Sequence, residues 1–405
     1  VTDGGAVSGG GKNSSGATNI EITWDALVSA DSSGGAAIGS GESSTGETTI
    51  NIHDTNPEKG VKSAFAYGGA GIGSGRYAKG KTYVTISNAS VSTLETPAAS
   101  TNTSGAGIGT GYGSQSNADI TITESTVKAV GGTGAAIGSG NRAKGNTDIL
   151  IKGATKVTAK GGSTAAGIGS GNGSNGSTTI NIEGGTITAE GGGKENGSCQ
   201  ASGAGIGSGG NALNKTTINI KGGEITATGG VSLDSRNHSD KWLSGAGIGS
   251  GSNVSGETEI NISGDSTIKS ASGGKYGGAG IGSGSGDTKN DSKKGAVTIN
   301  ITDGTIEKAE GKDGGAGIGS GYYGRSSTVN ISGNAELKDV KGGNLAAGIG
   351  SGYDSGKVDV VIDGGTIKAT GGDSAAGIGS GHNSRSSVII KSGTVNATGN
   401  GTGAG

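Results

Sequence analysis

One short string, Gly-Ala-Gly-Ile-Gly-Ser-Gly or a close variant of it, recurs eleven times along the chain. Neighbouring copies are between 29 residues apart, from Ile108 to Ile137, and 42 residues apart, from Ile206 to Ile248. A constant string at variable spacing indicates a repeat protein whose fixed units are joined by loops of different lengths. The recurring isoleucines are Ile38, Ile72, Ile108, Ile137, Ile168, Ile206, Ile248, Ile281, Ile318, Ile349 and Ile378.

Two further strings accompany each copy. One reads Thr-Ile-Asn-Ile, as at Ile180 and Ile182, and the other reads Gly-Gly-Thr-Ile-Thr-Ala, as at Ile187 and Ala189. Both alternate with a period of two, which is typical of strands with one apolar face. Three short strands with glycine between them describe one coil of a solenoid. We therefore predict an all-β fold, a right-handed parallel β-helix of about 12 coils, because parallel crossovers are strongly right-handed.

The repeats predict a single domain over residues 1–405. We expect an N-terminal capping coil over 1–41, regular coils over 42–381 and an incomplete C-terminal coil over 382–405, because the copies at both ends are degenerate. The chain starts at Val1 and shows no signal peptide or wall-sorting signal. We expect it to be part of a longer protein.

Stacked coils turn each repeat position into a column. Isoleucine, valine, alanine and the serine of the glycine-rich string are expected inside, with each serine hydroxyl hydrogen-bonded. An outward column rich in asparagine is expected to form an amide ladder. The glycines of the third strand leave two interpretations open. They permit backbone angles closed to other residues, or they form a bare outer face for contact with another surface.

Composition excludes several classes of protein. Glycine accounts for 94 of the 405 residues, but two prolines and the absence of a three-residue period exclude collagen. A net charge of −2 without a basic cluster argues against nucleic-acid binding. No apolar run is long enough for a membrane span. We expect no cofactor.

The residues that follow the glycine-rich string are the candidate ligand-binding residues. The fold does not require aromatic or guanidinium groups there, and both can contact sugars. If the coils stack, these residues form two clusters along one edge. We also expect the insertions 191–203 and 229–244 to pack together as a lobe. The candidates are Arg76, Tyr77, Tyr112, Arg142, Tyr322, Tyr323, Arg325, Tyr353, His382 and Arg385 at the edge, with Trp242 in the lobe.

Catalysis has one weak candidate pair. Asp119 and Asp148 occupy the same outward position on successive coils, about 5 Å apart by strand spacing, which suits two cooperating carboxylates. One stacked acid pair is also expected by chance. The histidines, His53, His238 and His382, lie in distant repeats and predict neither a triad nor a zinc site. We predict no metal site.

The string Gly-Ala-Gly-Ile-Gly-Ser-Gly, followed by Thr-Ile-Asn-Ile and Gly-Gly-Thr-Ile-Thr-Ala, resembles the repeats of large cell-surface proteins from Gram-positive gut Firmicutes. Many of these are labelled carbohydrate-binding domain proteins. The resemblance covers nearly the whole chain, and it implies an extracellular, secreted or wall-attached protein. It transfers no functional residue.

Three functions remain open. The first is a non-catalytic adhesin or stalk segment that recognises glycans or another cell-surface ligand through the loop edge. The second is a structural β-helix that self-associates through the glycine face or the coil ends. The third is a polysaccharide lyase or glycoside hydrolase, which the sequence favours least.

Overall fold

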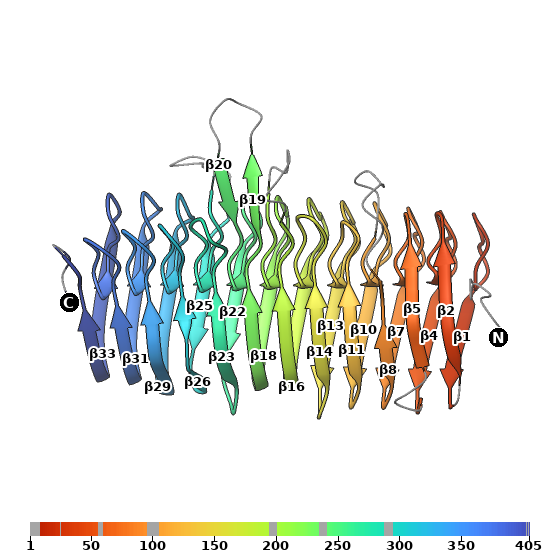
Figure 1. Ribbon diagram of the computed structural model, residues 1–405, viewed down its shortest axis with the longest axis horizontal. Coiled ribbons are helices and arrows are strands. Elements are labelled where there is room, and N and C mark those ends of the chain that lie inside the picture. The colour runs from red at the N-terminus through yellow and green to blue at the C-terminus, as the bar shows by residue number, and fades with distance from the viewer. Residues whose placement is uncertain are drawn as a thin grey trace.

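The computed structural model describes residues 9–24, 26–55, 60–94, 105–193, 201–234, 241–286, 295–401, 403 and 405. Its regular secondary structure consists of β-strands throughout. The strands stack side by side into a rod with the two termini at opposite ends (Figure 1). The predicted parallel β-helix is confirmed.

Each coil contributes a first strand and a second strand to one 20-stranded sheet. The first strands are β1 (Thr18–Thr23), β4 (Thr48–His53), β7 (Thr82–Ser87), β10 (Ala118–Thr123), β13 (Thr147–Lys152), β22 (Thr258–Ile262) and β25 (Val297–Ile301). The second strands are β2 (Leu27–Ser32), β5 (Gly60–Ala66), β8 (Ser90–Ser92), β11 (Thr126–Val130), β14 (Lys156–Lys160), β23 (Thr267–Ser272), β26 (Thr305–Ile306) and β27 (Ala309–Glu310).

In the remaining coils the first and second strands run together as one bent strand. These long strands are β16 (Thr178–Glu190), β18 (Thr216–Thr228), β29 (Ser327–Lys341), β31 (Val358–Thr370) and β33 (Ser386–Thr398). An Ile-Gly dipeptide forms the third strand of each coil, in a second sheet of 11 strands. These are β3 (Ile38–Gly39), β6 (Ile72–Gly73), β9 (Ile108–Gly109), β12 (Ile137–Gly138), β15 (Ile168–Gly169), β17 (Ile206–Gly207), β21 (Ile248–Gly249), β24 (Ile281–Gly282), β28 (Ile318–Gly319), β30 (Ile349–Gly350) and β32 (Ile378–Gly379).

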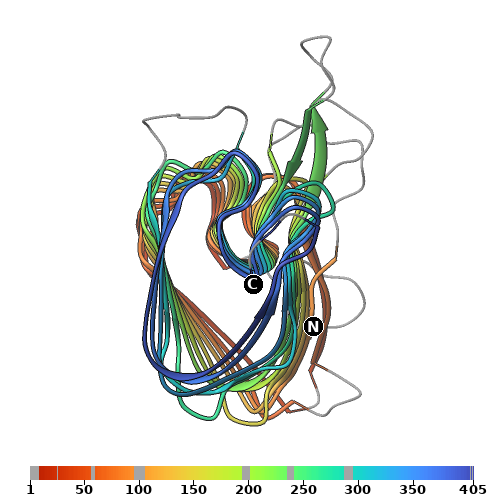
Figure 2. The same cartoon turned by 90° about the vertical axis from the view of Figure 1, so that its left-hand side faces the viewer.

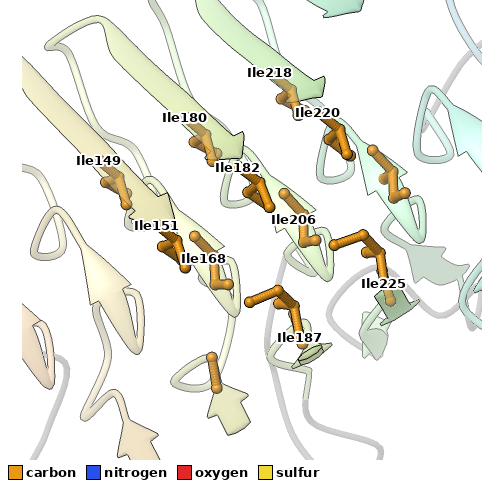
Figure 3. Packing of buried hydrophobic residues seen from close by; sticks show 14 of the residues in the cluster. Ile149, Ile151, Ile168, Ile180, Ile182, Ile187, Ile206, Ile218, Ile220 and Ile225 are labelled. Carbon is orange, nitrogen blue, oxygen red and sulfur yellow. The ribbon is translucent and has the colours of Figure 1, made fainter. Parts of the chain in front are cut away.

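Like residues stack on like residues between coils. Ile168 pairs with Ile206, and Ile206 pairs with Ile248, in parallel register. The first strands behave in the same way, with Ile180 opposite Ile218. Figure 3 shows these aliphatic side chains in parallel rows along the rod. Because most of them are fully buried, the core is a continuous set of aliphatic columns, as the alternation predicts.

The serine column is buried from Ser40 to Ser351. In nine coils the serine or threonine hydroxyl of the glycine-rich string accepts a hydrogen bond from the N–H of the last glycine of the same string in the next coil. Ser208 Oγ, for example, accepts from the N–H of Gly251 at 3.1 Å. Ser320 instead donates to the carbonyl of Arg325 at 2.6 Å. Each of these ten inward hydroxyl groups is therefore hydrogen-bonded, as expected.

The glycines of the third strand are buried against backbone. Gly207 has φ +135°, and a Cβ added to it would lie 1.8 Å from the carbonyl oxygen of Gly249 in the next coil. A Cβ on Gly205 would lie within 3 Å of backbone atoms of Ala189 and Thr228, at the ends of β16 and β18. The backbone interpretation is therefore correct, and the alternative, a bare glycine face open to a partner, is wrong because neighbouring chain already covers it.

Viewed along the rod, each coil has an indented outline rather than that of a simple three-sided prism (Figure 2). An antiparallel hairpin of β19 (Val231–Asp234) and β20 (Lys241–Ser244) projects from the rod between β18 and β21 (Figure 1). Its base contacts the neighbouring insertion, since Gly230 donates its N–H to Gly203 O at 2.9 Å. The bases of the two predicted lobe insertions thus lie together, and residues 194–200 and 235–240 are outside the described part of the chain.

An asparagine ladder runs along the outer face of five consecutive first strands. Nδ2 of Asn219 donates to Oδ1 of Asn181 at 2.9 Å, and Nδ2 of Asn261 donates to Oδ1 of Asn219 at 2.9 Å. The same bond links Asn300 to Asn261 and Asn330 to Asn300. The predicted amide ladder is confirmed over these coils, and it adds hydrogen bonds between coils outside the core.

Replacing Asn219 by alanine tests the ladder. Two side-chain hydrogen bonds are lost, each worth about 0.5–1.5 kcal/mol, so the free energy of unfolding should fall by about 1–3 kcal/mol. Asn51 occupies the same column between Glu21 and Thr85 and makes no ladder bond, so Asn51→Ala is the matched control. Urea denaturation of both variants gives the comparison. Equal losses for the two substitutions would contradict a stabilising ladder.

Candidate functional site

The loop edge consists of the two residues that follow each glycine-rich string. In most coils the second of them has positive φ, for example Tyr77 (55°), Arg142 (55°) and Tyr323 (47°). Its N–H donates to the next coil, as Tyr77 does to the carbonyl of Tyr112 at 3.0 Å. Glycine or asparagine occupies this position in other coils, including Gly113, Gly173, Asn211, Asn253 and Asn383. The local turn thus requires a left-handed residue, and tyrosine and arginine adopt it at a cost.

The first aromatic cluster contains Arg76, Tyr77, Tyr112 and Arg142, from three consecutive coils. The guanidinium carbon of Arg76 lies 4.7 Å from the ring centroid of Tyr77 and 5.4 Å from that of Tyr112. The two rings meet edge to face, with centroids 5.8 Å apart. Arg76 donates to the hydroxyl of Tyr77 at 3.1 Å, and Arg142 donates to that of Tyr112 at 3.3 Å. Stacking brings these four predicted residues together.

Gly113 makes room for the first aromatic cluster. A Cβ on this residue would lie 2.6 Å from Cε1 of Tyr77, so the ring rests directly on the glycine backbone. Sequence reasoning did not single out Gly113. The signal for it was present, because a glycine stands where neighbouring coils carry Tyr77 and Arg142.

The second aromatic cluster contains Tyr322, Tyr323, Tyr353 and His382. The rings of Tyr322 and Tyr353 stack with centroids 5.2 Å apart at 11°, and those of Tyr353 and His382 stack 5.3 Å apart at 6°. Tyr323 lies against Tyr322 with centroids 4.3 Å apart. Burial and the neighbouring tyrosine hydroxyl raise the pKa of Tyr322, so it is protonated at neutral pH. Both ring faces of Tyr353 are covered, which leaves ring edges and hydroxyl groups for any ligand.

Arg325 does not belong to the loop edge. Its side chain is buried, where it donates to the carbonyl of Gly256 at 2.5 Å and to the hydroxyl of Thr258 at 3.2 Å. Burial lowers the pKa of Arg325 to about 9, so the guanidinium stays protonated at neutral pH. The prediction that Arg325 projects from the edge is wrong. Its loop has one residue fewer between Gly321 and Ser327 than the loop from Gly251 to Thr258, and the arginine points inward.

Two ligand-binding candidates remain, Arg385 and Trp242. Arg385 is exposed in the loop before β33. Trp242 belongs to β20, where its backbone pairs with Leu233, and its side chain lies outside the described part of the structure. The binding roles of all these residues stay predictions.

The predicted adjacency of Asp119 and Asp148 is confirmed, because they are register partners in β10 and β13. Lys81 Nζ lies 2.8 Å from Oδ2 of Asp119, and this hydrogen bond raises the pKa of Lys81. The pair lies on the outer face of the first strands, where Asp119 is engaged in an ion pair. Across the residues that the structure describes, no three His, Cys, Asp or Glu side chains gather to form a metal site.

A histidine network that sequence reasoning missed joins the first coils. Nδ1 of His53 lies 3.0 Å from Oδ2 of Asp54, and its Nε2 lies 3.0 Å from Oε1 of Glu21. The hydrogen bond to Asp54, and then that to Glu21, raises the pKa of His53 above its usual 6.5. Asn88 in the following coil donates to the other carboxylate oxygen of Asp54 at 3.0 Å. The network therefore couples three coils.

We expect His53 to titrate above pH 6.5 in the folded protein. A raised folded pKa stabilises the fold fully below the unfolded pKa, and this contribution is lost as pH rises through the folded pKa. NMR titration should show a lower His53 pKa in Glu21→Gln and in Asp54→Asn. Asp31→Asn, which removes another exposed carboxylate of the first coil, should leave the titration unchanged. A His53 pKa that all three substitutions leave alone would contradict the network.

Comparison with known proteins supports the architecture. A family model described as a β-helix repeat matches residues 120–141, 149–172, 180–210, 218–252, 260–285, 299–322 and 360–382. Every matched segment runs from a first strand to the loop edge, which is one coil. The chain therefore has the fold of a parallel β-helix, and seven of its coils match this repeat model. No curated protein and no solved structure matches the chain. Within the described residues, no helix is long and apolar enough to span a membrane.

Proposed function

We propose that this chain is a segment of a non-catalytic extracellular surface protein, an adhesin or stalk, that contacts glycans through its loop edge. The observation that carries the proposal is the left-handed conformation of Tyr77, Arg142 and Tyr323. A left-handed residue other than glycine costs roughly 1–2 kcal/mol. Strain of this kind is commonly found at functional positions. The resemblance of the repeats to cell-surface proteins supports the extracellular location.

The geometry favours glycan contact by hydrogen bonding rather than by ring stacking. Arg76 covers Tyr77 and Tyr112, and both faces of Tyr353 are covered by neighbouring rings. The groups left at the surface are tyrosine hydroxyls and the exposed guanidinium of Arg142. Such groups suit the hydroxyl and carboxylate groups of an extended sugar chain lying along the rod.

A glycan array with the full chain tests this proposal. We expect the protein to bind, and Tyr77→Asn and Arg142→Asn to weaken binding by at least about tenfold, the loss of one good hydrogen bond. Asparagine tolerates the left-handed conformation, so neither variant should unfold more easily. If the unsubstituted chain binds no glycan, or if the variants bind as well as it does, the loop edge is not the glycan site.

A further inference from the structure

A group of cations lies on the loop edge and in the residues just after it, around the first aromatic cluster. The loop segments 76–81, 112–117 and 141–146 belong to three consecutive coils and contain no Asp or Glu. They contain five cations, Arg76, Lys79, Lys81, Arg142 and Lys144. Lys79, Arg142 and Lys144 are exposed, and Arg76 is half-buried. This basic edge is local, because the whole chain has a net charge of −2.

Two carboxylates beside the basic edge are already engaged. Asp119 is paired with Lys81, at 2.8 Å. Glu42, which holds the position of Arg76 in the preceding coil, is paired with Lys12 at 3.3 Å. Within the described structure, Arg76, Lys79, Arg142 and Lys144 form no ion pair with an acidic side chain. Four positive charges, two on the first and two on the third of three neighbouring coils, are therefore available to an anionic ligand.

The arginines of the basic edge are positioned in advance. Arg76 is held on the ring of Tyr77 and by the hydroxyl of that residue, and Arg142 is held by the hydroxyl of Tyr112. They lie two coils apart, which is about 10 Å along the rod. A guanidinium has five N–H donors in a planar fork that matches a carboxylate, so each arginine retains donors for a ligand.

We propose that the basic edge of residues 76–146 binds an acidic polysaccharide, a chain of sugars bearing carboxylates, laid along the rod axis. This inference rests on the proposed function and specifies its ligand class. The same features disfavour nucleic acid, because sequence-tolerant binding of single strands uses free aromatic faces for base stacking. Here the Tyr77 ring lies between Arg76 and Gly113. The loops of the second aromatic cluster carry less free positive charge, since Arg325 is buried and Lys357 is paired with Asp359 at 2.7 Å, which leaves Arg385 as their exposed arginine.

The test compares polygalacturonate with its methyl ester, which has the same sugar backbone without the charge. Isothermal titration with the full chain should detect binding of the acid, and binding should weaken as salt is added. The ester should bind at least about tenfold more weakly. Equal binding of the two polymers would overturn the acidic ligand class.

Variants place the site on the molecule. Arg142→Gln should weaken polygalacturonate binding by about tenfold, since one charge-assisted contact is lost. Arg385→Gln is the matched control, because it removes an exposed arginine from a loop nine coils along the rod from Arg76. This variant should bind polygalacturonate as tightly as the unsubstituted chain does. Equal losses in both variants would overturn the assignment to the basic edge, and so would equally tight binding of single-stranded DNA.

The outcomes also separate this inference from the proposed function. If neutral glycans on the array bind and polygalacturonate binds no better than its ester, glycan recognition stands and the acidic class fails. If no glycan binds, neutral or acidic, both the proposed function and this inference fail.

Discussion

Gly207→Ala is expected to open the middle of the rod. At φ +135°, the added methyl group would lie 1.8 Å from the carbonyl oxygen of Gly249. That oxygen accepts the N–H of Ser208 at 3.0 Å, so the next coil cannot move away without losing bonds between coils. The strained backbone and the backbone clash act together, and we expect local stability to fall by at least about 4 kcal/mol.

Native-state hydrogen exchange measures this effect coil by coil. Protection of residues 206–249 should drop in Gly207→Ala, and the loss should spread to the adjacent coils because each one covers its neighbour's core. Gly173→Ala is the control. Gly173 also has positive φ (59°), but its added Cβ would meet only Cγ of Arg142, at 3.8 Å. We expect Gly173→Ala to lower the local stability by about 1 kcal/mol. Comparable effects at the two glycines would mean that the contact between coils is unimportant.

Ile206→Ala is expected to produce the other large loss. The side chain is fully buried in the third-strand column between Ile168 and Ile248. Replacement leaves a cavity that the fixed spacing of the flanking coils keeps open. Removal of a buried isoleucine side chain typically costs about 2–5 kcal/mol, and we expect a value in the upper half of that range.

Ile389 provides the matched residue for this substitution. It is the same residue type, in β33, with an exposed fraction of 52%. Ile389→Ala should change the free energy of unfolding by less than about 0.5 kcal/mol. Urea denaturation and hydrogen exchange of both variants give the comparison. A loss at Ile389 as large as that at Ile206 would contradict the assignment of Ile206 to the core column.

The coil register has a clear consequence for binding surfaces. The second loop-edge residue of a coil donates its N–H to the carbonyl of the first loop-edge residue of the next coil, as Tyr77 does to Tyr112. Side chains on one coil therefore meet side chains one repeat away in the sequence. Arg76 thus meets Tyr112, and Tyr322 meets Tyr353. A ligand lying along the rod would therefore contact residues about 30 to 40 positions apart in the sequence, at a spacing of about 5 Å.

The sequence by itself determined the architecture and the columns. Period-two alternation identified the strands, and an unchanging string around Ile206 fixed which residues stack, because a parallel coil can repeat only in register. The serine bonds, the asparagine ladder and the adjacency of Asp119 and Asp148 follow from that register. So does the convergence of Arg76, Tyr77, Tyr112 and Arg142.

Only the tertiary structure decided which way individual groups point. Glycine is compatible with both a bare surface and a close backbone contact, and the carbonyl of Gly249 beside Gly207 decided for contact. A loop shorter by one residue turned Arg325 from the edge into the interior. Ring stacking covered the faces of Tyr353. Sequence spacing specifies which residues are neighbours, whereas the orientation of a side chain depends on the space that neighbouring coils leave for it.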